Sequence, residues 1–151
     1  MVDKALIADR LRLDEQVCFA LYAASNAVTR AYAPQLEQIG LTYPQFLVMI
    51  VLWEDGPSTL GNVAKRLRLP SNAITPLVDR LEAKELVERR RNAGDRRTVI
   101  VAPTKAGMLL MDDAAEVQAA VEARTKLDGS ELSRLRRDLR VLAERVEPRR
   151  D

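Results

Sequence analysis

The sequence predicts a mainly α-helical fold with one small β-hairpin, and three observations support this fold class. Aromatic residues make up only 4% of the chain, so the core must be built from Leu, Val, Ile and Ala, which favours helices. Apolar residues recur with a period near 3.6 in several segments. Between about residues 86 and 101 the pattern changes to two apolar, β-branched runs around a polar loop, which is typical of a hairpin.

Length and composition exclude several classes of protein. The 151 residues, 47% hydrophobic and 30% charged, predict one globular domain over residues 1–151. With no His and a single Cys, the chain has no His-based triad, no His metal site, no zinc-finger spacing and no internal disulfide. We therefore expect no metal and no cofactor. The lone Cys, the lack of a secretory signal and the lack of an apolar run of ~18 residues predict a cytoplasmic protein without a membrane partner.

The first two helices are bounded by clear signals. An apolar stripe of Val17, Leu21, Ala24 and Val28 predicts a first helix over about residues 14–33, with one buried face, that ends at Pro34. Thr42 is a plausible N-cap of a second helix, which has Pro44 in its first turn and ends at the Asp-Gly-Pro breaker of residues 55–57.

Two short amphipathic helices follow and meet across a tight turn. The first has its apolar face within residues 60–69, and the second, over residues 71–86, is expected to be capped by Ser71. This is the helix-turn-helix arrangement, in which the second helix enters the DNA major groove. Two strands, at residues 86–89 and 98–101, and a basic loop between them then predict a wing, so that residues 41–104 form a winged helix-turn-helix core.

The remaining helices lie outside that core. Thr104 is expected to cap a helix over about residues 105–126, and the Asp-Gly-Ser segment of residues 128–130 to cap a last helix over residues 131–147. The last helix carries a heptad-like apolar stripe of Leu132, Leu135, Leu139, Leu142 and Val146. Such a stripe has two interpretations: it packs against other helices of the same chain, or it forms an interface with a second copy of the chain. We predict a homodimer built from residues 12–34 and 105–147, since a palindromic operator needs two recognition helices ~34 Å apart.

Charge is unevenly distributed although the net charge is only +2. Residues 59–101 hold ten basic and five acidic side chains, so this middle segment carries +5 and the flanks together −3. A basic middle segment indicates a polyanionic partner, although charge runs are also common on ordinary solvated surface.

The segment from Leu41 to Thr104 resembles the MarR family of winged-helix regulators. It reads LTYPQFLVMIVLWEDGPSTLGNVAKRL, then SNAITPLVDRLEAKELVERR, then GDRRTVIVAPTKAG, with Asp95-Arg96-Arg97 as the family's most distinctive wing signature. The resemblance covers roughly 130 residues. It implies a DNA-binding transcriptional repressor rather than an enzyme, with double-stranded palindromic operator DNA as the partner.

The first helix further resembles the organic-hydroperoxide-sensing OhrR subfamily. Cys18, Phe19 and Tyr22 match its Cys-Phe-x-x-Tyr pattern, and the chain's two other tyrosines, Tyr32 and Tyr43, also stand at pattern positions. By this resemblance, Tyr22 and a Tyr32 from across the dimer hydrogen-bond the sulfur. The resemblance assigns redox sensing to Cys18, Tyr22, Tyr32 and Tyr43.

The residues themselves agree with peroxide sensing. The dipole at a helix N-terminus favours the thiolate that a peroxide sensor needs, and Tyr22 lies one helical turn from Cys18. Without a second Cys, an oxidised Cys18 would form a mixed disulfide with a small-molecule thiol, form a sulfenamide, or be overoxidised. The alternative is that Cys18 is an inert core residue.

Contacts with DNA are expected from three elements. On the recognition helix we expect base or phosphate contacts from Ser71, Asn72, Thr75 and Arg80, and Lys65 on the preceding helix suits phosphate contact. By resemblance, Arg96 and Arg97 belong to the wing, with Arg97 entering the minor groove and Asp95 orienting it.

Other functions compete with the peroxide-sensing repressor. A MarR-type regulator could respond to a small phenolic or other lipophilic ligand, with Cys18 merely structural. A thiol peroxidase using Cys18 would have no resolving Cys and no His base, and a helical interaction module would make no contact with DNA.

Overall fold

The computed structural model of the chain describes residues 10–147, and it confirms a mainly helical fold with a small antiparallel sheet. In chain order the elements are η1 (Leu13–Glu15, a 3-10 helix), α2 (Val17–Gln38), α3 (Tyr43–Asp55), β1 (Ser58–Thr59), α4 (Leu60–Leu67), α5 (Ser71–Ala83), β2 (Val87–Arg91), β3 (Val99–Pro103), α6 (Lys105–Arg124) and α7 (Gly129–Val146).

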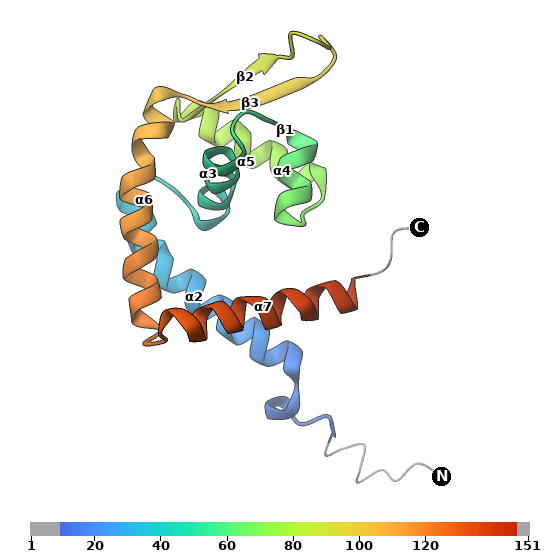
Figure 1. Cartoon of the computed structure of the whole chain (residues 1–151), viewed down its shortest axis with the longest axis vertical. Coiled ribbons are helices and arrows are strands. Elements are labelled where there is room, and N and C mark those ends of the chain that lie inside the picture. Colours follow the sequence, from blue (N-terminus) through green and yellow to red (C-terminus); the bar gives the residue numbers. More distant parts are fainter. Residues whose placement is uncertain (1–9, 148–151) are drawn as a thin grey trace.

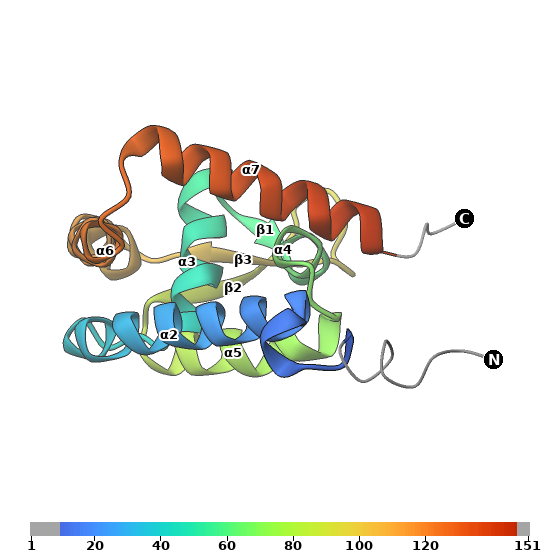
Figure 2. The ribbon, with the colours of Figure 1, turned by 90° about the horizontal axis from the view of Figure 1, so that it is seen from below.

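The elements separate into a lobe and an extended helical end (Figure 1). Helices α3, α4 and α5 pack together beside the three strands, and α6 leads from this lobe to the other end of the molecule. There α2 and α7 extend in the same general direction on opposite sides of the view from below (Figure 2). The wing therefore lies at one end of the molecule, and α2 and α7 lie at the other end (Figure 1).

The core of the lobe is aliphatic, as the low aromatic content requires. Leu36, Met49, Leu52, Ile74 and Leu81 are fully buried, and they come from α2, α3 and α5. Burial of this apolar surface joins the end of α2 to the helix-turn-helix.

Side-chain caps begin four of the helices. Thr42 and Asp128 each form a capping box at the start of α3 and α7, and Thr104 accepts a hydrogen bond from the backbone N–H of Gly107 at the start of α6. Thr59 caps α4 in the same way. The predicted cap at Ser71 is wrong: Pro70 holds the N-cap position of α5, no side chain caps it, and Ser71 is the first helical residue.

The predicted end of the first helix at Pro34 is also wrong. Pro34 removes one helical hydrogen bond, but α2 continues for another turn because Leu36 is fully buried in the core. The helix ends where Gly40 adopts a left-handed φ of 75° and the N–H of Leu41 bonds to the carbonyl of Leu36 at 2.9 Å. Glycine is suited to this conformation because it has no Cβ.

The sheet has the order β1-β3-β2, with both pairs antiparallel. The predicted hairpin is confirmed, although its strands run to Arg91 and Pro103 and α5 ends at Ala83 rather than at 86. The two-residue strand β1, in which Ser58 pairs with Val101, was not predicted, since two residues carry no periodic signal.

Two predicted apolar stripes are not buried within the chain. Val17 is 63% exposed and Val28 40% exposed on α2, and Leu135 and Leu139 on α7 are 46% and 41% exposed. The prediction that α2 buries the Val17–Val28 face is therefore wrong for the single chain. Within residues 10–147, no single helix is long and apolar enough to cross a membrane, and only α2 and α3 together, bent by 76°, reach that length and composition.

Close backbone packing joins α6 to the lobe at Gly107. The Nε1–H of Trp53 donates a hydrogen bond of 3.0 Å to the Gly107 carbonyl oxygen. A Cβ added at residue 107 would lie 2.1 Å from the Leu86 carbonyl oxygen and 3.2 Å from Cε of Met49. A side chain at this position therefore cannot fit without a shift of the backbone.

Candidate nucleic-acid interface and cysteine site

The predicted recognition helix has one buried and one exposed face. Ile74, Val78 and Leu81 of α5 are fully buried against the lobe. The four α5 residues predicted to contact DNA, like Lys65 on α4, are all exposed. They are Ser71, Asn72, Thr75 and Arg80.

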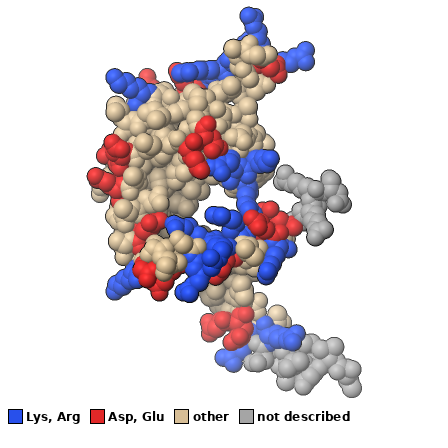
Figure 3. Space-filling view, in the orientation of Figure 1, with Lys and Arg blue, Asp and Glu red and all other residues tan. Residues whose placement is uncertain are grey.

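The tip of the wing is shaped by Asp95. Its Oδ1 accepts a hydrogen bond of 2.9 Å from the backbone N–H of Arg97, and its Oδ2 accepts one of 3.1 Å from the hydroxyl of Thr98. Arg96 and Arg97 are exposed, and basic side chains protrude from the end of the wing (Figure 3). Asp95 thus orders the backbone that carries Arg97 by a main-chain hydrogen bond. The entry of Arg97 into the minor groove stays a prediction.

The sequence does not predict an ion-pair cluster that joins the wing to α5. The Arg89 guanidinium bonds to Asp79 and to Glu82 of α5, and its backbone N–H donates to Oε1 of Glu82 at 3.3 Å. Burial alone would lower the pKa of Arg89, but these two carboxylates raise it overall. The i, i+3 spacing of the two carboxylates was the only signal in the sequence.

The structure separates the four predicted redox residues into two groups. Cys18 is exposed on the first turn of α2, and Tyr22, one turn later, is 67% exposed. Tyr32 and Tyr43 instead pack together with ring centroids 5.2 Å apart, and both pack on Phe46. Cys18 and Tyr32 are 14 residues apart on one helix, about 21 Å, so they do not meet within one chain.

The environment of the paired tyrosines disfavours their ionised forms. Burial raises the pKa of Tyr32, and the neighbouring Tyr43 and Glu122 raise it further. Burial also raises the pKa of Tyr43. Both phenols therefore keep their protons, and can act as hydrogen-bond donors, throughout the neutral range.

A dependence of stability on alkaline pH follows from these shifts. Because the folded state resists ionisation, the contribution of Tyr32 and Tyr43 to stability is complete below the ordinary phenol pKa of about 10 and is lost as pH rises through the raised values. We expect urea unfolding of the wild type to show a steeper loss of stability above pH 10 than Tyr32→Phe or Tyr43→Phe. Equal slopes for all three proteins would contradict this cause.

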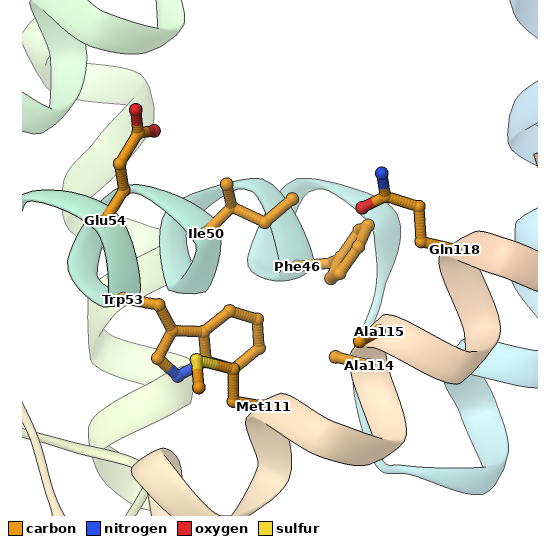
Figure 4. Close-up of a pocket in the computed structure, with 8 residues that line it drawn as sticks. All are labelled: Phe46, Ile50, Trp53, Glu54, Met111, Ala114, Ala115 and Gln118. Carbon is orange, nitrogen blue, oxygen red and sulfur yellow. The ribbon is translucent and has the colours of Figure 1, made fainter. Parts of the chain in front are cut away.

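An apolar pocket of about 300 Å³ lies between α3 and α6 (Figure 4). The sequence does not predict this pocket, because the residues that line it form no recognisable sequence motif. Phe46, Ile50 and Trp53 of α3 face Met111 and Ala114 of α6, and Glu54 and Gln118 supply polar groups at the rim. Phe46 also contacts both tyrosines, so the pocket and the aromatic pair share one side chain.

Comparison with known proteins gives consistent matches. Residues 30–114 match the family described as transcriptional regulator SarA/Rot. The chain is 35% identical over 136 residues, 90% of its length and 92% of the relative's, to the organic hydroperoxide resistance transcriptional regulator of Bacillus subtilis.

Solved structures agree in fold. One similar structure is that of reduced AbfR of Staphylococcus epidermidis bound to DNA. Its sequence is 30% identical to this chain, and the superposition has a TM-score of 0.77 and covers 95% of this chain and 99% of AbfR. AbfR has also been solved in an overoxidized DNA-bound form and a disulfide form, at TM-scores of 0.76 and 0.63. CouR of Rhodococcus jostii bound to p-coumaroyl-CoA is 27% identical with a TM-score of 0.77, covering 88% of this chain and 95% of CouR.

Proposed function

Because the chain belongs to the MarR/SarA family of winged-helix, DNA-binding transcriptional regulators, we propose that it is a homodimeric repressor that releases its operator when an organic hydroperoxide oxidises Cys18. The observation that carries this proposal is the exposed Cys18 on the first turn of α2, in a chain similar over nine-tenths of its length to a hydroperoxide resistance regulator. The family and the relatives that match this chain are transcriptional regulators and not enzymes.

In the proposed dimer, α2 and α7 supply the interface. Both helices expose large apolar side chains, such as Val17, Tyr22 and Leu135, that would be covered by a second copy. A two-fold axis there would set two α5 helices and two wings against successive turns of a palindromic operator. In this arrangement Tyr22 of one protomer and Tyr32 of the other would donate hydrogen bonds to the Cys18 sulfur, and Tyr43 would pack against that Tyr32.

The proposed sensing step is a two-electron oxidation. The Cys18 thiolate attacks one oxygen of the hydroperoxide, the S–O bond forms as the O–O bond breaks, and the other oxygen leaves as the alcohol after taking up a proton. Cys18 becomes the sulfenic acid and the peroxide is reduced. A small-molecule thiol then condenses with the sulfenic acid, forming a disulfide and releasing water. The bulky adduct on α2 repacks the interface and changes the spacing of the two recognition helices.

Fluorescence anisotropy on operator DNA, taken from upstream of the protein's own gene, tests the proposal. Wild type and Cys18→Ser are each titrated with cumene hydroperoxide and a small thiol at fixed salt. We expect both proteins to bind in the absence of peroxide and only the wild type to be released. Release of both proteins, or of neither, would refute sensing through Cys18.

A second candidate, response to a small lipophilic ligand, is favoured by the pocket between α3 and α6. Its lining is mainly apolar, and the similar CouR has been solved with p-coumaroyl-CoA bound. Trp53, the chain's single Trp, lines this pocket and provides an intrinsic fluorescence signal. Under this candidate, phenolic carboxylates quench Trp53 and release DNA equally from wild type and Cys18→Ser.

A further inference from the structure

The recognition helix contains a proline where helices rarely tolerate one. Pro76 is the sixth residue of α5 and is exposed. It lies about half a turn around the helix from the buried Ile74 and Val78, and on the same side as the exposed Asn72. Pro76 therefore lies near the middle of the outward face, which the proposed function directs into the major groove.

Pro76 changes the hydrogen bonding of the helix backbone at this face. Proline has no N–H, so the carbonyl of Asn72, four residues earlier, lacks its helical donor, and the ring pushes that carbonyl away from the axis. Within residues 10–147, no backbone N–H from outside α5 bonds to this oxygen. The Asn72 carbonyl has therefore lost its i+4 helical donor, and it lies beside an apolar ring on the exposed side of the helix.

The neighbouring charge on the outward face is already engaged. Asp79, the next residue along this face, pairs with Arg89 of the wing. At the centre of α5, the outward face consequently presents the Asn72 carbonyl and the Pro76 ring together with the exposed side chains of Asn72 and Thr75.

We propose that Pro76 reads one base pair in each half-site. The freed Asn72 carbonyl accepts a hydrogen bond from an exocyclic amino group in the major groove, while the ring packs on a thymine methyl group. Adenine N6 is such an amino donor, and its partner thymine carries the methyl group, so an A·T pair offers both groups at once. This inference rests on the proposed role of α5, and it predicts an A·T requirement that depends on Pro76.

The test compares Pro76→Ala with Pro34→Ala, which makes the same chemical change inside α2. Each protein is measured by competition anisotropy against duplexes that carry a single base-pair change at each operator position. For Pro76→Ala we expect discrimination at one A·T position per half-site to fall roughly tenfold or more, with the other positions unchanged. Pro34→Ala lies on a helix of the proposed dimer interface, so its overall affinity can change, but its relative discrimination among the duplexes is expected to match the wild type. Both variants are expected to raise Tm because each removes a proline from a helix.

The outcomes are distinguishable. An unchanged profile for Pro76→Ala, an equal loss at every position, or the same change in Pro34→Ala would each overturn the base-reading role while leaving the proposed repressor intact. If the wild type itself does not discriminate operator from scrambled DNA, the proposed function fails instead. Pro76→Val keeps apolar bulk but restores the N–H, so loss of discrimination in this variant as well supports the carbonyl contact.

Discussion

Replacement of Gly107 by alanine is expected to destabilise the protein strongly. The new Cβ would lie 2.1 Å from the Leu86 carbonyl oxygen, which is held in place by a hydrogen bond of 3.0 Å from the backbone N–H of Thr104. Neither backbone can yield alone, because Trp53 also anchors the Gly107 carbonyl. We expect a loss of about 2–4 kcal/mol, since overpacking against backbone forces the elements apart.

Thermal and urea unfolding at fixed protomer concentration measure this loss, which corresponds to a fall in Tm of roughly 5–15 °C. Gly61→Ala in α4 is the matched control, because the nearest atom to its added Cβ is 4.0 Å away. The control should be neutral or more stable by up to about 1 kcal/mol, as expected for Gly→Ala in an exposed helix. If Gly107→Ala behaves like Gly61→Ala, the close approach of α6 to Leu86 is not rigid.

Loss of the two wing-tip arginines is expected to weaken DNA binding by about two orders of magnitude. Arg96 and Arg97 are exposed, and Asp95 fixes the backbone of Arg97, so both side chains reach outward from an ordered turn. If each makes one phosphate or minor-groove contact, the Arg96→Ala/Arg97→Ala protein loses about tenfold per contact, or 1.4 kcal/mol each. Its slope of log affinity against log salt should also become shallower by about 0.9 per lost contact.

Anisotropy titrations over a range of salt concentrations measure both quantities. The control is Arg136→Ala/Arg137→Ala on α7, which makes the same change in net charge at the end of the molecule away from the wing. Because α7 belongs to the proposed dimer interface, both double variants are first confirmed to be dimers by size-exclusion chromatography. Equal changes in the two double variants would mean that net charge, rather than the wing, governs binding.

The helices and their order could be predicted from the sequence because their signals are local. Thr42, Thr104 and Asp128 are caps that act on the next three residues, and an apolar period of 3.6 needs no knowledge of the rest of the fold. One error at a proline has a tertiary cause, because burial of Leu36 carries α2 past Pro34. The other is a local shift of one residue: Pro70, and not the expected Ser71, holds the N-cap of α5.

The candidate site could be predicted only in part. The exposed DNA-facing residues follow from the helix period and the wing motif, and the Cys-Phe-x-x-Tyr segment follows from resemblance. Contacts between distant segments could not be predicted. Examples are the ion pairs of Arg89 with α5, the packing of Tyr32 on Tyr43 and the apolar pocket between α3 and α6. Each of these depends on which faces meet in the folded chain.

The ion pairs between Arg89 and α5 limit how this protein can be re-engineered. Asp79 and Glu82 lie on the recognition helix, but their partner is on β2, outside the segment that a helix exchange would transfer. In a chimera that receives a foreign α5 without these carboxylates, the partly buried guanidinium of Arg89 loses both ion-pair partners. The wing then loses the ion pairs that connect it to α5. Exchange of operator specificity between relatives therefore requires that residues 79, 82 and 89 be transferred as one unit.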